Sequence, residues 1–194
     1  MSSEGLTSET SGNISVHNRE EGLMAISPLG IGYFETNPKD VVIMNLQGEI
    51  VEGDRKPSSE WGHKVKPACE AAIHTHSMYC TVFASLNQPL RAVHYVIGDA
   101  GTATVPCAPY EIFGTEELAQ SVARTIGESN AVLLANHGML ACGADIESAY
   151  GLAKGMEYCA ELQYRCMCIG NPVILSDDEM DVVMEKFKSY GQKK

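Results

Sequence analysis

The sequence predicts an α/β protein of the α+β type: a single three-layer domain over residues 1–194, in which helices cover a central, mostly antiparallel β-sheet. Three observations indicate this fold. Short apolar runs are joined by hairpin-like turns, helical segments do not alternate with them in regular βαβ units, and no convincing linker divides the chain. With 194 residues, of which 44% are hydrophobic, the chain can bury one full-sized core.

The expected strands are short runs rich in apolar and β-branched residues. The runs at 41–44 and 49–51 are separated by Asn-Leu-Gln-Gly, a sequence suited to a hairpin turn. Residues 1–9 are expected to be mobile or to form a truncated N-terminal helix. The remaining predicted strands are 14–16, 23–26, 71–76, 92–97, 102–107, 131–135 and 139–142.

Three helices are predicted from their caps and apolar stripes. One spans 115–128 and opens on a threonine followed by two glutamates, which suit the positive end of the helix dipole. The longest, 146–169, follows an aspartate N-cap and stops at the Gly-Asn-Pro sequence of 170–172. The last begins at a capping box formed by Ser176 and Glu179.

Charge and composition narrow the function. The formal net charge is -11 with only 14 Lys and Arg, so no nucleic-acid partner is expected. The chain has neither a basic and apolar leader nor an apolar run of about 18 to 20 residues, so we expect a cytoplasmic protein without a membrane span. Its seven cysteines contain no CxxC pair and are expected to be reduced. Partners should be small molecules or other copies of the chain.

Three histidines after apolar runs carry most of the functional information. His74 and His76 are two residues apart, so in an extended strand both imidazoles point to the same face. His137 follows another apolar run and precedes Gly138, where the chain can turn sharply. Three neutral nitrogens with an open position suit a catalytic zinc better than a structural one. The alternative, ordinary polar residues at strand ends, is less favoured for this combination.

A second informative segment is the sequence KPSSEW at 56–61, expected to be a loop entering a helix. The hydroxyls of Ser58 and Ser59, with free amides at a helix start, can hold a phosphate, while Glu60 can ligate a metal or act as a general base. Taken alone, the segment is better explained as an N-capped surface helix. Two weaker anion-binding candidates are the turns at 10–13 and 27–30.

Taken together, these residues resemble one family, the zinc-dependent class II aldolases of the L-fuculose-1-phosphate aldolase type, in the aldolase and ribulose-phosphate 4-epimerase superfamily. The resemblance runs from about Gly5 to Gly191. Eight segments in the same order are more specific than any single motif. They are SGNISV (11–16), ISPLGI (26–31), KPSSEW (56–61), HTHS (74–77), HYVIGDAG (94–101), PCAPYEIFGT (106–115), NHGML (136–140) and EKFKSYG (185–191).

The resemblance implies a site and an assembly. Zn²⁺ would be held by three histidines, with Glu60 as fourth ligand in the resting site and as proton shuttle once substrate displaces it. Tyr95 would lie beside the aldehyde, Tyr190 in the tail would assist proton transfer, and the chain would form a homotetramer. Leu29 stands in the phosphate loop where the family commonly carries Thr or Ser. The implied metal ligands are Glu60, His74, His76 and His137, and the implied phosphate-binding segment residues are Gly12, Asn13, Leu29, Gly30, Ser58 and Ser59.

The implied activity is reversible aldol cleavage of a ketose 1-phosphate to dihydroxyacetone phosphate and a short aldehyde such as lactaldehyde. Alternatives within the superfamily are an L-ribulose-5-phosphate 4-epimerase and a methylthioribulose-phosphate dehydratase or salvage aldolase. A non-enzymatic zinc-binding scaffold is a further alternative, disfavoured by the presence of Glu60 and both tyrosines. Only thirteen residues separate Glu60 from His74, fewer than this resemblance leads us to expect.

Overall fold

A computed structural model describes residues 1–60, 66 and 69–189 of the chain. Its main sheet has eight strands in the order β4-β3-β2-β1-β5-β10-β9-β8, and all neighbours are antiparallel except β8 and β9. The predicted mixed fold with a mostly antiparallel sheet is therefore confirmed. The strands are β1 (Asn13–Asn18), β2 (Leu23–Ile26), β3 (Val42–Asn45), β4 (Ile50–Glu52), β5 (Ala71–Thr75), β8 (Cys107–Ala108), β9 (Ala131–Leu134) and β10 (Gly138–Gly143).

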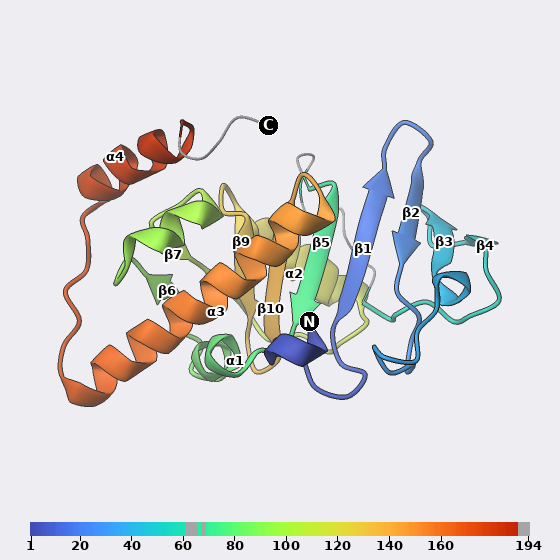
Figure 1. Ribbon diagram of the computed structural model, residues 1–194, viewed down its shortest axis with the longest axis horizontal. Coiled ribbons are helices and arrows are strands. Elements are labelled where there is room, and N and C mark those ends of the chain that lie inside the picture. Colours follow the sequence, from blue (N-terminus) through green and yellow to red (C-terminus); the bar gives the residue numbers. More distant parts are fainter. Residues whose placement is uncertain (61–65, 67–68, 190–194) are drawn as a thin grey trace.

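Helices cover both faces of the sheet, which gives the three layers. In Figure 1, α3 (Ile146–Ile169) crosses in front of β9 and β10 and α2 (Glu116–Ile126) lies behind the sheet. The α3 side holds the larger buried cluster, which includes Ile73 and Met139, and α1 (Met78–Ser85) packs there as well. A smaller cluster, including Ala72 and Leu134, lies under α2. Alternate residues of β5 therefore enter different cores.

The predicted helices are found at α2, α3 and α4 (Asp177–Phe187), with the expected caps. For α2, Thr115 Oγ1 accepts the N–H of Leu118. For α4, Ser176 and Glu179 form the predicted capping box. Among the described helices, none combines the length and the apolar character that crossing a bilayer requires.

One predicted strand is wrong. The run 92–97 does not extend as a strand, because residues Tyr95–Ala100 form a 3-10 helix, η3. His94 caps this helix by accepting the N–H of Val96 on its Nδ1 atom, and Gly101 ends it in the left-handed region at φ 76°. A local side-chain bond of this kind competes with strand pairing. The apolar run instead buries Ile97 in the larger core.

Two further differences have local causes. The predicted strand 102–107 is divided into β7 (Thr104–Val105), which pairs with β6 (Leu90–Arg91), and β8 in the main sheet. Pro106 lies between them and cannot donate to a strand partner. The sequence does not predict helix α1, because an eight-residue run of mostly apolar residues has no polar face that would reveal a helical period.

The N-terminal residues contact the body of the protein. Residues 1–9, expected to be mobile or to form a truncated helix, include a short 3-10 helix, η1, at Ser2–Glu4. A second short 3-10 helix, η2, spans Pro38–Asp40. Leu6 belongs to the larger core, and Glu4 accepts a hydrogen bond from the Tyr150 hydroxyl of α3 at 2.7 Å. These contacts hold the N-terminal segment against the α3 layer.

Candidate functional site

The three histidines meet at one end of the sheet. His74 lies on β5 and His76 directly follows that strand, so their side chains point to the same face. His137 lies in the tight turn between β9 and β10, where Asn136 has φ 55° and the His137 N–H donates to the Leu134 carbonyl at 3.0 Å. Because β10 pairs with β5, this turn places His137 beside the other two histidines.

A glycine permits that close approach. At Gly138, a Cβ atom would lie 2.2 Å from the Thr75 carbonyl oxygen and 3.1 Å from a His76 ring carbon. No other residue type fits such a gap without moving the backbone. The glycine of the HisGly pair is therefore required by the packing of β10 on the end of β5.

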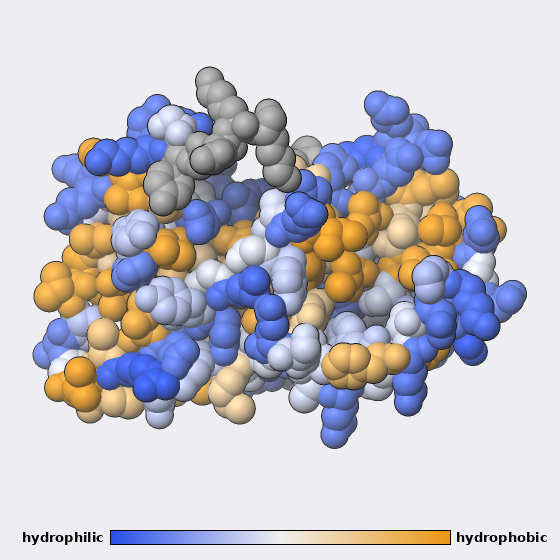
Figure 2. All heavy atoms as spheres, viewed as in Figure 1, coloured by the Kyte–Doolittle hydropathy of each residue, from blue (hydrophilic) through white to orange (hydrophobic). Residues whose placement is uncertain are grey.

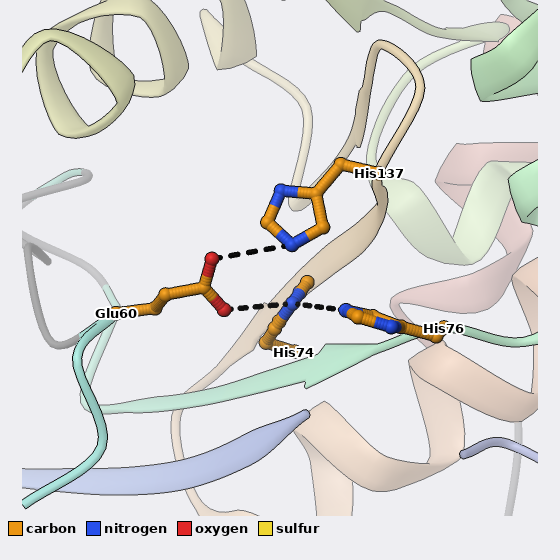
Figure 3. Close-up of side chains that lie close together, drawn as sticks. All are labelled: Glu60, His74, His76 and His137. Atoms are coloured by element: carbon orange, nitrogen blue, oxygen red, sulfur yellow. Dashed lines mark hydrogen bonds and ion pairs between the residues drawn. The ribbon is translucent and has the colours of Figure 1, made fainter. Parts of the chain in front are cut away.

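Glu60 completes the cluster (Figure 3). Its Oε2 atom lies 3.1 Å from His74 Nε2, and its Oε1 atom lies 3.2 Å from His137 Nε2. The Nε2 atoms of His74 and His76 are 3.0 Å apart. One ligand atom from each of the four residues lies within 4.8 Å of the other three. The structure thus brings together all four residues that the sequence suggested as metal ligands.

The chemistry of these groups fits a divalent metal. His74 Nδ1 donates to the Met139 carbonyl at 3.0 Å, which leaves the Nε2 lone pair facing the cluster, as is usual for histidine ligands. The Oε1 atom of Glu60 is buried and accepts no hydrogen bond, although it lies 3.2 Å from His137 Nε2. Three imidazole nitrogens and a carboxylate oxygen form a donor set typical of zinc.

The charge states agree with this fit. Burial lowers the pKa of His76 to about 4, and the neighbouring His74 and His137 add to the effect. Burial also lowers the pKa of His137. Burial alone would raise the pKa of the Glu60 carboxyl, but its hydrogen bond with His74 and the attraction of the three histidines in their protonated forms outweigh burial, so the pKa is lowered. Neutral imidazoles and an ionised carboxylate are the forms that bind metals.

The candidate anion-binding residues adjoin the cluster. Asn13, at the start of β1, pairs directly with His74 and donates from Nδ2 to Ser58 Oγ at 3.2 Å. The Ser58 N–H donates to the Ser27 carbonyl at 3.1 Å, while its Oγ accepts the N–H of Glu60 at 3.5 Å. The segment that carries Glu60 is therefore tied to β1 and to the turn after β2.

The other phosphate candidates have different surroundings. Gly12 has φ 78°, and a Cβ there would lie 2.5 Å from the His74 carbonyl oxygen. Gly30 also has a positive φ, 70°, but open space around it. Leu29 is 43% exposed, so its side chain is not buried in the site, and its backbone N–H donates to the Lys56 carbonyl at 2.8 Å.

A pocket of about 260 Å³ opens beside the cluster on the α2 face of the sheet. Its polar end is formed by Asn13, Ser59, Glu60 and His74, and Thr115 lies at the start of α2. The rest of the pocket has an apolar wall, which the sequence does not reveal as part of a site. Apolar residues at the spacing of a helix or a strand predict only that these residues are buried in the core. These wall residues are Ala72, Leu118, Ala119, Val122, Leu134 and Leu140.

The two predicted catalytic tyrosines remain predictions. Tyr95 lies on η3, half exposed, with its ring centroid 4.6 Å from that of His94 and 6.1 Å from that of Phe187 on α4. It is not among the residues that line the pocket. Tyr190, and the helix expected to follow Glu60, lie outside the described residues.

The mostly antiparallel sheet brings three histidines together at one end, beside the Glu60 carboxylate, and this arrangement is that of a metal-binding protein. A family profile described as "Class II Aldolase and Adducin N-terminal domain" matches residues 1–164. The chain belongs to the class II aldolase family, whose members depend on a metal, and it is a lyase. This result favours an enzyme over the zinc-binding scaffold considered above.

Individual relatives are similar over nearly the whole chain. The 5-deoxy-D-ribulose 1-phosphate aldolase of Bacillus thuringiensis serovar kurstaki is 48% identical over 197 aligned residues, covering 99% of this chain and 92% of that protein. The L-fuculose phosphate aldolase of Escherichia coli strain K12 is 40% identical over 197 residues, with 98% and 90% covered. A solved structure of an L-fuculose 1-phosphate aldolase has a TM-score of 0.93 at 43% identity, with 96% and 90% covered.

Proposed function

We propose that the chain catalyses zinc-dependent, reversible aldol cleavage of a ketose 1-phosphate similar to L-fuculose 1-phosphate. The products are dihydroxyacetone phosphate and a short aldehyde such as lactaldehyde. The observation that carries the proposal is the position of Glu60, whose carboxylate contacts His74 and His137 while its loop is tied to Asn13. In this proposal one segment supplies both the carboxylate that would bind the metal and the serine hydroxyls that would bind the donor phosphate.

The protein residues have separate roles in this proposal. Asn13, Ser58 and Ser59, with the backbone at Gly12 and Gly30, hold the phosphate of the donor half. When bound, Zn²⁺ would polarise the C2 carbonyl and stabilise the negative charge that develops beside it. In cleavage the C3–C4 bond breaks, and the carboxyl of Glu60 returns a proton to C3 of the donor half. In synthesis the Glu60 carboxylate removes that same proton.

Tyr190 and Tyr95 complete the proposal on the aldehyde side. Tyr190 assists the loss of the C4 hydroxyl proton to solvent as the aldehyde leaves, solvent supplies the proton that the Glu60 carboxyl gives to C3, and Tyr95 lies beside the aldehyde. Both assignments derive from the resemblance of HYVIG and FKSYG to the family. The aldehyde end of the proposed site would then combine chain segments that are far apart in the sequence.

A second candidate substrate is 5-deoxyribulose 1-phosphate. It is favoured by the 48% identity to the 5-deoxy-D-ribulose 1-phosphate aldolase described above, which exceeds the identity to the L-fuculose phosphate aldolase. Both substrates share the dihydroxyacetone phosphate half and end in a methyl group. The two candidates therefore differ only in the aldehyde that is released.

We further propose that the chain acts as a homotetramer. Figure 2 shows hydrophobic residues on the surface over the β1–β4 part of the sheet and along α3. Exposed apolar side chains on these elements include Ile50 and Val51 on β4, Tyr164 and Ile169 on α3. Such surfaces support assembly with other copies, and sedimentation of the purified protein measures the number of subunits.

A substrate panel tests the function. Purified protein is incubated with L-fuculose 1-phosphate, 5-deoxyribulose 1-phosphate, 5-methylthioribulose 1-phosphate and L-ribulose 5-phosphate, with zinc and with excess chelator. We expect release of dihydroxyacetone phosphate from at least one ketose 1-phosphate, and loss of that release with chelator. If the protein epimerises the pentulose 5-phosphate and releases no dihydroxyacetone phosphate from any substrate, the aldolase proposal is wrong and the protein is an epimerase.

A further inference from the structure

Glu157, on α3, lies outside the metal cluster, and no sequence motif marks it. Its half-buried carboxylate accepts two backbone hydrogen bonds from α1, from the N–H of Tyr79 at 2.8 Å and from the N–H of Cys80 at 2.9 Å. Each oxygen takes one bond. In the described part of the chain, no lysine or arginine forms an ion pair with Glu157. Both oxygens of the carboxylate therefore bind backbone N–H groups at the start of α1.

These two bonds replace the usual cap of that helix. Ser77 is the N-cap residue of α1, but its side chain makes no capping hydrogen bond. The first N–H groups of a helix have no partner within the helix, and a negative charge there interacts favourably with the helix dipole. Glu157 supplies both the acceptors and the charge from a different helix. The contact fixes the first turn of α1 against α3.

The first turn of α1 is next to the metal ligands in the chain. Only Ser77 separates His76 from Met78, the first residue of α1. His76 itself lies just beyond the end of β5, so strand pairing does not hold its backbone. Its position is determined by β5 on one side and by the anchored start of α1 on the other.

The same turn also reaches His74 by a second route. The Cys80 thiol contacts Met139 Sδ at 3.8 Å, and the Met139 carbonyl accepts from His74 Nδ1 at 3.0 Å. Burial raises the pKa of the Cys80 thiol, so its S–H remains available as a donor. Cys80 is therefore bonded both to Glu157, through its N–H, and to the residue that orients the His74 ring.

We propose that Glu157 is a positioning residue for the metal centre. By holding the first turn of α1, it fixes the backbone of His76, and through Cys80 and Met139 it helps to set the orientation of His74. The inference rests on the metal-binding part of the proposed function and is independent of which sugar phosphate is the substrate.

The test compares Glu157→Gln with Glu161→Gln, in the full-length chain. Glutamine at position 157 keeps the size of the side chain but lacks the charge and one of the two acceptor oxygens. Glu161 is a matched control, because it lies one turn further along α3 and forms its ion pair with Arg165 at 2.6 Å. Three quantities are measured without substrate: the Zn²⁺ affinity by chelator competition, the visible absorption of the Co²⁺-loaded protein, and the Tm of the metal-free protein.

We expect E157Q to weaken Zn²⁺ binding about tenfold, the lower end of the effect of losing a group that orients metal ligands, and to change the Co²⁺ spectrum. E161Q should match the parent in both. A lower metal-free Tm for E157Q, with unchanged affinity and spectrum, would make Glu157 a purely structural cap and overturn the inference.

Two further measurements keep the test decisive. If E157Q does not fold, Glu157→Asp keeps the charge but withdraws it by one methylene, and its Zn²⁺ affinity should fall below that of the parent; an unchanged affinity overturns the inference. If the parent itself does not bind one Co²⁺ per chain, the proposed metal site fails and the inference fails with it. Parent binding with an unaffected E157Q refutes the inference alone.

Discussion

Asn13 and His74 lie directly opposite each other in the antiparallel pairing of β1 with β5. Opposite residues in such a pair point to the same face of the sheet. A polar amide at 3% exposure and a candidate metal ligand therefore share one pocket, which also contains Ser59 and Glu60. The first testable prediction follows from this pairing.

Replacing Asn13 by alanine should weaken phosphate recognition. A hydrogen bond from the Asn13 amide to the charged phosphate contributes about 1.5 kcal/mol to binding. Its loss should therefore raise the KM for the ketose 1-phosphate about tenfold. Competitive inhibition by inorganic phosphate should weaken in parallel. Steady-state kinetics measure both, with Asn18→Ala at the exposed end of β1 as control. An N13A enzyme with unchanged phosphate inhibition would remove Asn13 from the phosphate site.

Glu60→Gln should separate metal binding from proton transfer. The amide oxygen can still approach the metal, whereas the amide cannot accept and return a proton at neutral pH. The variant should therefore keep much of its zinc, yet lose solvent exchange of the C3 proton of dihydroxyacetone phosphate by at least about 100-fold. NMR in deuterated water measures the exchange and elemental analysis the zinc. Glu117→Gln, exposed in the first turn of α2, is the control, and unchanged exchange in E60Q would exclude the assigned role.

Gly12→Ala should destabilise the protein more than Gly22→Ala. Both glycines have a positive φ, 78° and 67°, so both substitutions introduce similar backbone strain of about 1 kcal/mol. Only at Gly12 would the new Cβ also collide with backbone, at 2.5 Å from the His74 carbonyl, whereas nothing lies within 4 Å at Gly22. Urea unfolding of the metal-free variants compares the two. Equal losses of stability would show that β1 can move away from β5.

The metal-free protein should lose stability between about pH 6.5 and pH 4. Burial lowers the pKa of His76 to about 4 in the folded state, while an unfolded histidine titrates near 6.5. In this window the unfolded chain binds a proton that the folded protein does not, so the free energy of unfolding falls as the pH falls. Urea titrations with chelator measure the trend, and His76→Asn should flatten it. A variant as pH-dependent as the parent would contradict the assignment to His76.

Parts of the fold could be predicted because their signals are local. Thr115, Asp145 and Ser176 cap helices within a few residues of themselves, and all three helices begin where these caps indicate. The strand prediction at 92–97 is wrong because His94 makes a local hydrogen bond that no periodicity reveals. Pro106, by contrast, is a visible signal, since it interrupts a strand by lacking a donor.

The sequence by itself determined which chemical groups the candidate site contains. These are the HxH pair at the end of a strand, the HisGly turn and the carboxylate after two serines. They could be identified because residue type and the two-residue period of a strand are visible without coordinates. Only the tertiary structure decided that Glu60 contacts His74 and His137, that Asn13 faces the same pocket, and that Glu157 holds the start of α1. These relationships depend on strand order and helix packing between residues up to about 80 positions apart, and burial of the whole core, rather than local preference, selects that arrangement.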